Sequence, residues 1–247
     1  MTIAHRGDPL VHRENTLPSL QSAVDKGANT LEFDLRLTRD GQIVLLHDAS
    51  LERLWGVPGQ LADHTLSDLR QLTQSDLRQR DLGGYRLPLF EEVLAAFPET
   101  TFLVDLKTDD VVAPAVRTLR EFGGDAFERS IFVAARKGGR EALIELRRNE
   151  PDAVIGLDWT AAEPPAEELL DTLRPQYFGP RWAVADAAGV PAMRERGYRV
   201  WVGPLADPGQ VADALAYGVD GIVADDISDL LARCAAGAGA GAPGQGD

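Results

Sequence analysis

Two hydrophobic periods alternate along this chain. Short apolar runs rich in β-branched residues are separated by segments in which apolar residues recur every three or four positions, as on one face of a helix. This alternation predicts βα units and a parallel sheet. The predicted strands are Thr2–His5, Thr30–Leu37, Ile43–His47, Thr101–Lys107, Ile131–Ala135, Ala153–Asp158, Gln176–Phe178, Arg199–Gly203 and Gly221–Ala224. The predicted helices are Leu17–Lys26, Leu89–Ala96, Val111–Phe122, Arg140–Arg148, Glu167–Leu173, Ala185–Arg196, Gln210–Tyr217 and Ile227–Ala235.

The number of strands favours an α/β fold of the TIM type, a (β/α)8 barrel, which is common at a length of 247 residues. Nine strands are predicted where a closed barrel needs eight. Asp40 and Gly41 form a hairpin signal between two of them. We therefore expect Ile43–His47 to pair antiparallel with the preceding strand or to lie at the rim of the barrel.

Residues 49–86 interrupt the alternation. They contain scattered glycines and prolines and one short helical pattern, Ser67–Thr73. We expect this segment to be a small insertion on the catalytic face of the barrel, covering the site. The end of the chain, AAGAGAGAPGQGD, is of low complexity. The sequence thus predicts a single domain over residues 1–234 and a disordered tail over residues 235–247.

Net charge limits the partners. At −14, the chain is unsuited to nucleic acid or to an anionic lipid surface, so a phosphate ligand needs a local cation, either a metal or a few Arg and Lys side chains. Cys234 is the single cysteine, which excludes an internal disulfide and a cysteine-based zinc cluster. No apolar run reaches the roughly 20 residues that span a bilayer, and the start, MTIAHRG, has no signal-peptide pattern. We expect a cytoplasmic protein with a small-molecule partner; the sequence does not determine the oligomeric state.

Two carboxylates lie in the apolar run TLEFDLRL. Because side chains alternate across a strand, Glu32 and Asp34 share one face and Phe33 and Leu35 share the other. Two carboxylates on one face repel each other, and a divalent cation removes this repulsion because Mg²⁺ and Ca²⁺ take oxygen ligands. The alternative is an exposed edge strand whose acidic residues face water. The spacing alone leaves both interpretations open.

The run TFLVDLK has the same geometry. Asp105 and Lys107 share one face of its strand. Taken alone, they are most simply a structural ion pair. Beside Glu32 and Asp34, Asp105 would be a third oxygen ligand and Lys107 a phosphate contact.

Two histidines end predicted strands. His5 is followed by Arg6, and His47 ends the third predicted strand. In βα barrels catalytic groups lie at the C-terminal ends of strands. Imidazole titrates near neutral pH, so two histidines suit a general acid and a general base on opposite sides of a phosphorus. Arg6 offers a planar set of donors for phosphate oxygens. A single histidine at a strand end is more often structural, but two of them near a carboxylate cluster favour catalysis.

These residues belong to a series of motifs that resembles the glycerophosphodiester phosphodiesterase family, within the phospholipase-C-like barrels. The motifs are AHRG at 4–7, ENT at 14–16, LEFDLRLTRDGQIVLLHD at 31–48, LPLFEEVL at 87–94, VDLK at 104–107 and GVDGIVAD at 218–225. They follow the family's order at about its spacing and cover most of the chain. The N-terminal block is the most specific of them.

The resemblance implies a phosphoric diester hydrolase that converts a glycerophosphodiester to glycerol 3-phosphate and an alcohol, as part of lipid and glycerol metabolism. It implies one divalent cation, Mg²⁺, Ca²⁺ or Mn²⁺, and a cyclic phosphate intermediate formed by the neighbouring hydroxyl of the glycerol. The residues that it implies are Glu32, Asp34 and Asp105 for the metal, His5 and His47 as acid and base, Arg6 and Lys107 for the phosphate, and Glu14 close to the site. Trp201 is a candidate residue of the site wall.

Several departures from the family concern the substrate. Asp105 stands where the family usually has Glu, and Arg13 where it usually has Pro. The late strand VWVGPLADP keeps Trp201 without the family's Asn, and IFVAARKGG near residue 131 lacks the usual Ser-Phe pair. The altered walls favour one alternative, a lyase or cyclising phosphodiesterase (or an enzyme of a specialised metabolite) in the same metal barrel. A second alternative is a non-catalytic barrel that binds a phosphorylated ligand. The retained histidine pair argues against the second.

Overall fold

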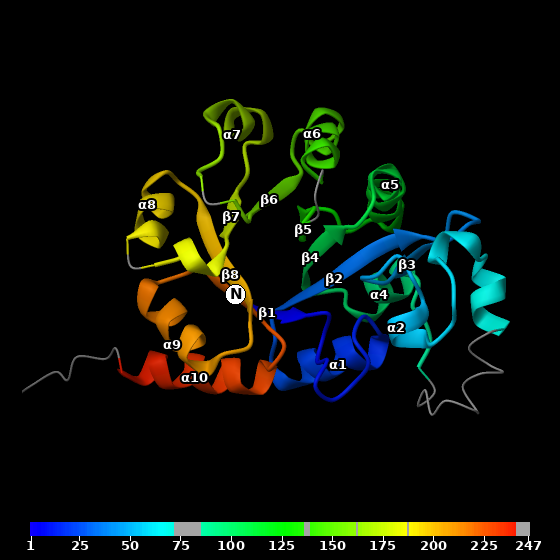
Figure 1. Cartoon of the computed structure of the whole chain (residues 1–247), viewed down its shortest axis with the longest axis horizontal. Coiled ribbons are helices and arrows are strands. Elements are labelled where there is room, and N and C mark those ends of the chain that lie inside the picture. The colour runs from blue at the N-terminus through cyan, green and yellow to red at the C-terminus, as the bar shows by residue number, and fades with distance from the viewer. Residues whose placement is uncertain (72–84, 136–138, 162, 187, 241–247) are drawn as a thin grey trace, which may run out of the picture.

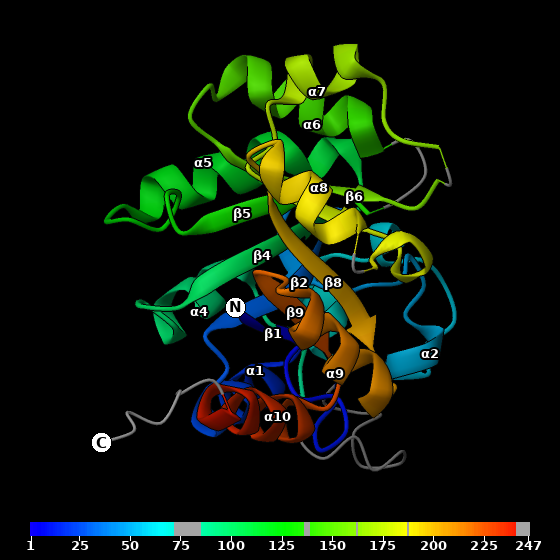
Figure 2. The same ribbon diagram turned by 90° about the vertical axis from the view of Figure 1, so that its left-hand side faces the viewer.

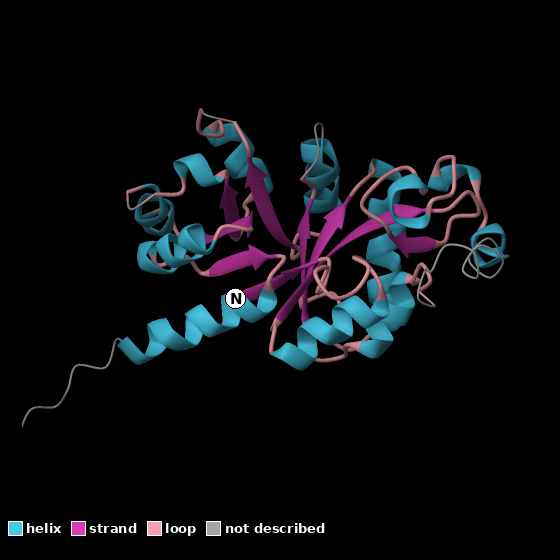
Figure 3. Ribbon diagram, turned by 60° about the horizontal axis from the view of Figure 1, so that its bottom comes forward, coloured by secondary structure: helices cyan, strands magenta, loops and turns pink. Residues whose placement is uncertain are grey.

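A ring of parallel strands forms the centre of the molecule, and helices surround it (Figures 1 and 3). The computed structural model describes residues 1–71, 85–135, 139–161, 163–186 and 188–240. Within this part of the chain, eight parallel strands follow the order β1, β2, β4, β5, β6, β7, β8, β9, and β1 pairs with both β2 and β9. Their bounds are β1 Thr2–His5, β2 Thr30–Leu37, β4 Thr101–Leu106, β5 Ser130–Val133, β6 Val154–Trp159, β7 Tyr177–Pro180, β8 Arg199–Leu205 and β9 Gly221–Ala224. The predicted TIM-type barrel is confirmed.

The ninth strand lies outside the ring. β3, Ile43–Leu45, pairs antiparallel with β2, so that Leu45 lies opposite Leu35. The backbone N–H of Leu46 then donates to the carbonyl of Asp34 at 2.9 Å. The predicted antiparallel pairing is therefore confirmed, although the strand ends two residues before His47. This hairpin returns the chain to the C-terminal end of β2 and so brings His47 back toward the carboxylates.

Side chains along each strand point alternately outward to the helices and inward to the barrel axis. The outward side chains form an outer apolar core, and the inward ones form a smaller inner core. On β2, Phe33 and Leu35 are buried under the helices, whereas Glu32 and Asp34 point into the barrel. The barrel interior below them is filled by a smaller apolar cluster of Ile3, Leu103, Ile131, Val133, Tyr177, Trp201 and Val223. This packed interior is the floor on which the polar site lies.

Helices follow most of the strands and cover the outer core (Figure 2). Their bounds are α1 Leu17–Lys26, α4 Phe90–Ala96, α5 Val112–Phe122, α6 Gly139–Asn149, α7 Glu167–Leu173, α8 Gly189–Glu195, α9 Pro208–Tyr217 and α10 Ile227–Ala240. The helix predicted over Ala185–Arg196 begins four residues late, after a 3-10 turn at Trp182–Val184. In the part of the chain that the structure describes, none of the helices combines the length and the apolar composition needed to cross a membrane.

The last helix is longer than the sequence pattern predicted. α10 continues to Ala240, five residues beyond the predicted end at Ala235. Four of the six residues over 235–240 are alanine, the best helix former, which offsets the cost of the two glycines. Residues 235–240 of the predicted tail are thus helical, and residues 241–247 lie outside the described residues. α10 packs beside α1 and α9 (Figure 1).

The segment after β3 has an apolar core of its own. It contains α2, Glu52–Trp55, then a 3-10 turn at Leu61–Asp63, and residues 66–71 are helical. The short helix predicted over Ser67–Thr73 thus starts one residue early, and its last two residues lie outside the described part. The buried residues of this core are Val44, Leu46, Leu51, Trp55, Leu61, Leu69 and Leu87. Because β3 contributes Val44 to it, the segment is attached to the strand that leads to His47.

Candidate active site

Three carboxylates converge inside the barrel mouth. Glu32 and Asp34 come from β2, and Asp105 from β4, where it lies in register with Asp34. Each of the three offers an oxygen atom within 4.8 Å of the others, and all three side chains are buried. The interpretation of β2 as an exposed edge strand is therefore wrong, because β2 is paired on both sides within the closed ring.

Burial makes this cluster unfavourable without compensating positive charge. Burial raises the pKa of Glu32 well above its ordinary value, and the charges of Asp34 and Asp105 raise it further. Burial also raises the pKa of Asp105. For Asp34 burial acts in the same direction, but Lys107 and Arg6 outweigh it, so the pKa of Asp34 is lowered. Three carboxylates thus share one site in which they repel one another.

Two cationic side chains reach the cluster. Lys107 Nζ lies 3.0 Å from Asp34 Oδ1 and 2.8 Å from Asp105 Oδ2, and Arg6 Nε lies 3.2 Å from Asp34 Oδ2. These two positive charges leave the three carboxylates with a net negative charge. A divalent cation reverses that sign, and its preferred oxygen ligands are the groups present. The three carboxylates therefore fit a hard divalent cation, and the resulting net positive site suits a phosphodiester anion.

The loop after β1 is shaped to reach the carboxylates. The backbone N–H of Arg6 donates to Glu32 Oε2 at 2.9 Å, with Arg6 in the left-handed region at φ 56°. Gly7 follows at φ 92°, and a Cβ there would lie 2.6 Å from the backbone carbon of Ser19, so only glycine fits. This close approach of β1 to α1 fixes where the Arg6 side chain begins.

Asn15 is a site residue that the sequence analysis did not single out. It is buried at φ 56°, and its Nδ2 donates to Asp34 Oδ2 at 2.7 Å. The backbone N–H of Asp34 donates in turn to Asn15 Oδ1. Asparagine tolerates the left-handed conformation better than most residues, which was the available signal in the ENT motif. Asn15 holds one oxygen of Asp34 and leaves the other turned toward Lys107.

Both histidines carry a carboxylate partner. His5 Nδ1 donates to Asp225 Oδ1 and His47 Nδ1 donates to Asp48 Oδ1, each at 2.7 Å. A carboxylate at Nδ1 keeps the proton on that nitrogen and leaves Nε2 available on the other side of the ring. His5 and His47 line one cavity of about 200 Å³ together with the three carboxylates. The sequence analysis assigned no role to Asp48 or Asp225.

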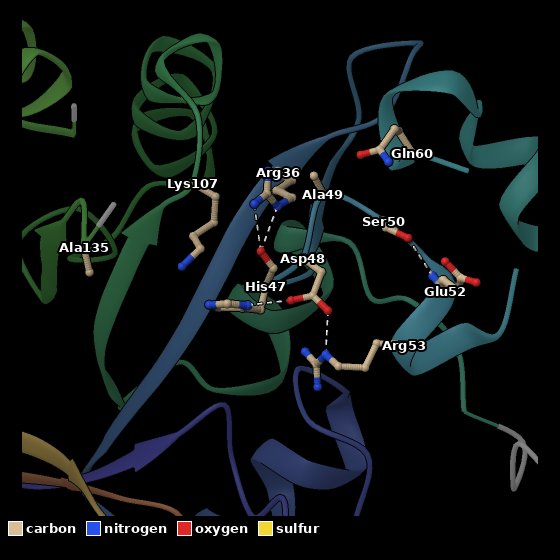
Figure 4. Close-up of a pocket in the computed structure, with 10 residues that line it drawn as sticks. All are labelled: Arg36, His47, Asp48, Ala49, Ser50, Glu52, Arg53, Gln60, Lys107 and Ala135. Carbon is tan, nitrogen blue, oxygen red and sulfur yellow. Dashed lines mark hydrogen bonds and ion pairs between the residues drawn. The ribbon is translucent and has the colours of Figure 1, made fainter. Parts of the chain in front are cut away.

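An arginine of the inserted segment connects several of these groups. Arg53 on α2 donates through Nε to Asp48 Oδ2 at 2.5 Å (Figure 4). Its two terminal nitrogens contact the carboxylate of Glu14 at 2.7 and 3.0 Å. Glu14 in turn accepts from Arg6 Nη1 at 2.9 Å. Glu14 thus lies beside the site as the resemblance implied, and Arg53 supports both His47, through Asp48, and Arg6.

We expect Asp48→Asn to lower stability in a pH-dependent way. The hydrogen bond from Arg53, with a contribution from His47, lowers the pKa of Asp48 to about 2. A carboxylate with a depressed folded-state pKa stabilises the protein above its unfolded pKa, and this contribution disappears as the pH falls through the folded value. In urea unfolding, the gap between wild type and variant should stay open from pH 7 to pH 5 and narrow from about pH 4 toward pH 2. A gap that is constant over the whole range would contradict the ion pair.

The wall opposite β1 contains an acidic residue that the sequence analysis left without a role. Trp201 on β8 is buried, stacks on Tyr177 with ring centroids 5.3 Å apart, and donates through Nε1 to Asp158 Oδ1 at 3.1 Å. Burial, with a further contribution from Asp105, raises the pKa of Asp158 to about 7. Trp201 and Asp158 both line the cavity that holds the histidines. The available signal was an acidic residue at an inward position of an otherwise apolar strand.

A second, more open pocket of about 830 Å³ adjoins this cavity (Figure 4). His47, Lys107 and Ala135 line both spaces. The remaining lining residues are Arg36, Asp48, Ala49, Ser50, Glu52, Arg53 and Gln60, so that the inserted segment forms one side. The site therefore consists of a small inner cavity and an open polar outer pocket that meet at His47.

Comparison with known proteins assigns this arrangement to a family. Residues 5–229 match the model of the glycerophosphoryl diester phosphodiesterase family. The sequence is 26% identical to a glycerophosphodiester phosphodiesterase of Caldanaerobacter subterraneus subsp. tengcongensis, over 94% of this chain and 96% of that enzyme. Over 44% of this chain and 37% of the relative, it is 38% identical to a lysophospholipase D of Rattus norvegicus.

Solved structures share the fold. A phosphodiesterase from Oleispira antarctica, in complex with the product sn-glycerol-3-phosphate, superposes with a TM-score of 0.83 at 22% identity, covering 95% of this chain and 96% of that one. A glycerophosphodiester phosphodiesterase from Thermotoga maritima gives a TM-score of 0.77 at 21% identity, with coverages of 94% and 96%. The same barrel is thus built from largely different sequences.

Proposed function

The chain belongs to the glycerophosphoryl diester phosphodiesterase family, and we propose that it hydrolyses a glycerophosphodiester to glycerol 3-phosphate and an alcohol, using one divalent cation and the pair His5 and His47. The single observation that carries this proposal is the presence of both histidines and the three carboxylates around one cavity. A protein that only binds a phosphorylated ligand needs no acid–base pair, so the arrangement favours catalysis over binding.

Glu32, Asp34 and Asp105 are the proposed ligands of the cation, which is Mg²⁺, Ca²⁺ or Mn²⁺. When bound, such a cation polarises a phosphoryl oxygen and offsets charge that develops on it. Asp105 is shorter than the family's usual Glu, and the backbone N–H of Ala135 donates to its Oδ1 at 3.2 Å. That contact and the hydrogen bond from Lys107 Nζ to Oδ2 hold both oxygens of the shorter carboxylate.

Arg6 and Lys107 are the proposed phosphate contacts. Both already pair with the carboxylates, Arg6 with Asp34 and Glu14, and Lys107 with Asp34 and Asp105. These pairs would weaken if the carboxylates held a cation, because their negative charge would then be shared with it. The nitrogen atoms of Arg6 and Lys107 then have donors available for the phosphate oxygens. Lys107 can thus form the structural ion pair with the carboxylates and, in the proposed complex, contact the phosphate.

His5 and His47 are the proposed acid–base pair. Each donates from Nδ1 to a carboxylate, so proton transfer takes place at Nε2 on the other side of the ring. There the neutral ring takes a proton, and the doubly protonated ring gives one. One histidine takes the proton of the attacking hydroxyl, which belongs to water or to the neighbouring carbon of the glycerol. The other gives a proton to the departing alcohol. When the attacking hydroxyl belongs to the glycerol, this step leaves a cyclic phosphate, which a water molecule then opens to glycerol 3-phosphate.

The test is turnover of defined substrates. Purified protein would be incubated with glycerophosphocholine or glycerophosphoethanolamine in the presence of Mg²⁺, Ca²⁺ or Mn²⁺ and followed by ³¹P NMR. We expect glycerol 3-phosphate as the final product and no turnover after chelation of the cation. A cyclic phosphate that persists would instead identify the alternative lyase reaction. Turnover at the full rate without any cation would contradict the proposal.

A further inference from the structure

Asp158 lines the inner cavity from the strand that lies opposite Arg6. In the ring of eight strands, β6 is four places from β1, which places it opposite the strand that ends in His5 and leads to Arg6. Asp158 and Arg6 nevertheless line the same cavity of about 200 Å³. In a cavity this small, a ligand held by its phosphate near Arg6 can reach Asp158 with its organic group.

Three neighbouring strands, β6, β7 and β8, together position the carboxylate of Asp158. Asp158 on β6 lies in register with Gly179 on β7, and the next strand, β8, contributes Trp201. A Cβ on Gly179 would lie 2.3 Å from both Asp158 Oδ1 and Trp201 Nε1. The absence of a side chain at this position is thus what allows the indole and the carboxylate to meet.

The hydrogen bond to Trp201 uses only one oxygen of Asp158. Oδ1 accepts from the indole, and among the described residues the structure gives no hydrogen bond to Oδ2. The side chain is only partly buried, because it is accessible from the cavity that it lines. The remaining oxygen is an acceptor in need of a donor, since an unpaired carboxylate oxygen is costly once a ligand displaces water from it.

We propose that Asp158 accepts a hydrogen bond from the terminal hydroxyl of the substrate's glycerol and thereby selects glycerophosphodiesters in which that hydroxyl is free. This inference rests on the proposed function. The small inner cavity holds the glycerophosphoryl group, and the open outer pocket takes the alcohol beyond His47. An ester at the terminal position has no hydrogen to donate, so a lysophospholipid acylated there leaves Asp158 unpaired.

The substrate pair that tests this inference differs in one hydroxyl. A phosphodiester of propane-1,2-diol keeps the hydroxyl next to the phosphate and lacks the terminal one of glycerol. The assay is run at about pH 8, above the pKa of about 7 of Asp158, so that this carboxylate is ionised. For the wild type, kcat/KM should then be about 10- to 100-fold lower for the propanediol compound, the range expected for a lost hydrogen bond to a charged group. In Asp158→Leu the activity on the glycerol compound should fall by the same factor, and activity on the propanediol compound should not change. The preference between the two substrates then disappears.

Two further variants separate recognition from structural effects. Trp201→Phe keeps the aromatic packing and removes the donor to Oδ1, so it should retain the preference for glycerol. Asp158→Asn keeps the shape, and its amide can donate to the same hydroxyl, so its loss should be at most about tenfold. A preference lost in Trp201→Phe, or an equal loss on both substrates in Asp158→Leu, would overturn the inference.

Measurements on the wild type alone distinguish a failure of the proposed role of Asp158 from a failure of the proposed phosphodiesterase activity. If it hydrolyses both compounds equally well, the role of Asp158 is wrong and the phosphodiesterase activity stands. If it hydrolyses neither compound with any of the three cations, the proposed function itself fails.

Discussion

Asp34→Asn should abolish turnover and the response of the protein to divalent cations together. Asp34 is the central ligand candidate, since Asn15 fixes its Oδ2 and Lys107 lies against its Oδ1. The amide keeps the shape and removes the charge. A cation that stabilises the developing charge contributes several kcal/mol, so we expect a fall in kcat/KM of at least about 10³-fold. The measurement is turnover of glycerophosphocholine at saturating Mg²⁺, Ca²⁺ or Mn²⁺.

Thermal unfolding provides the second measurement. Ligands that bind only the folded state raise the unfolding temperature, so each effective cation should stabilise the wild type but not Asp34→Asn. Asp171→Asn makes the same chemical change at an exposed position on α7 and should behave as the wild type. If the cation still stabilises Asp34→Asn, it binds elsewhere and the proposed ligand set is wrong.

His5→Ala and His47→Ala should lose turnover and keep the cation response. Neither histidine belongs to the three carboxylates, so stabilisation by the cation should be unchanged. The loss of a proton-transfer group costs roughly 10²- to 10⁴-fold in rate. The pair of measurements thus separates the acid–base groups from the ligands.

The activity losses of His5→Ala and His47→Ala should depend differently on whether the leaving group needs a proton. His47 lines both the inner cavity and the outer pocket, whereas His5 lines only the inner one. We therefore expect His47 to give the proton to the departing alcohol. With p-nitrophenol as the leaving group, which departs without a proton, His47→Ala should recover most of its activity and His5→Ala should not. Equal losses with both leaving groups would contradict this assignment.

Local patterns predicted the fold well because the barrel is built from repeated local units. The alternation on β2 that places Glu32 and Asp34 on one face is a property of any strand, and so is the hairpin signal at Asp40 and Gly41. The structure confirms both. The exact ends of elements were less predictable: His47 lies beyond β3 because the chain leaves the sheet to enter the inserted segment.

Contacts between distant segments could not be predicted from the sequence. Asp225 lies 220 residues from His5, and they meet only because β1 and β9 are neighbours in the closed ring. Asp158 and Trp201 come from two strands separated by a third, and only the absence of a side chain at Gly179 lets them touch. Arg53 is one of many arginines, and its two carboxylate partners identify it only in three dimensions.

The pairing of β1 with β9 also makes the order of protein synthesis relevant to the site. The ribosome releases the proposed ligands and both histidines within the first 107 residues, well before the last strand exists. His5 receives its carboxylate partner only when Asp225 has been translated and β9 has closed the ring. A chain cut by a protease before residue 225 therefore lacks the carboxylate that accepts from His5 Nδ1. We therefore expect such a chain to lose the proposed proton transfer at His5.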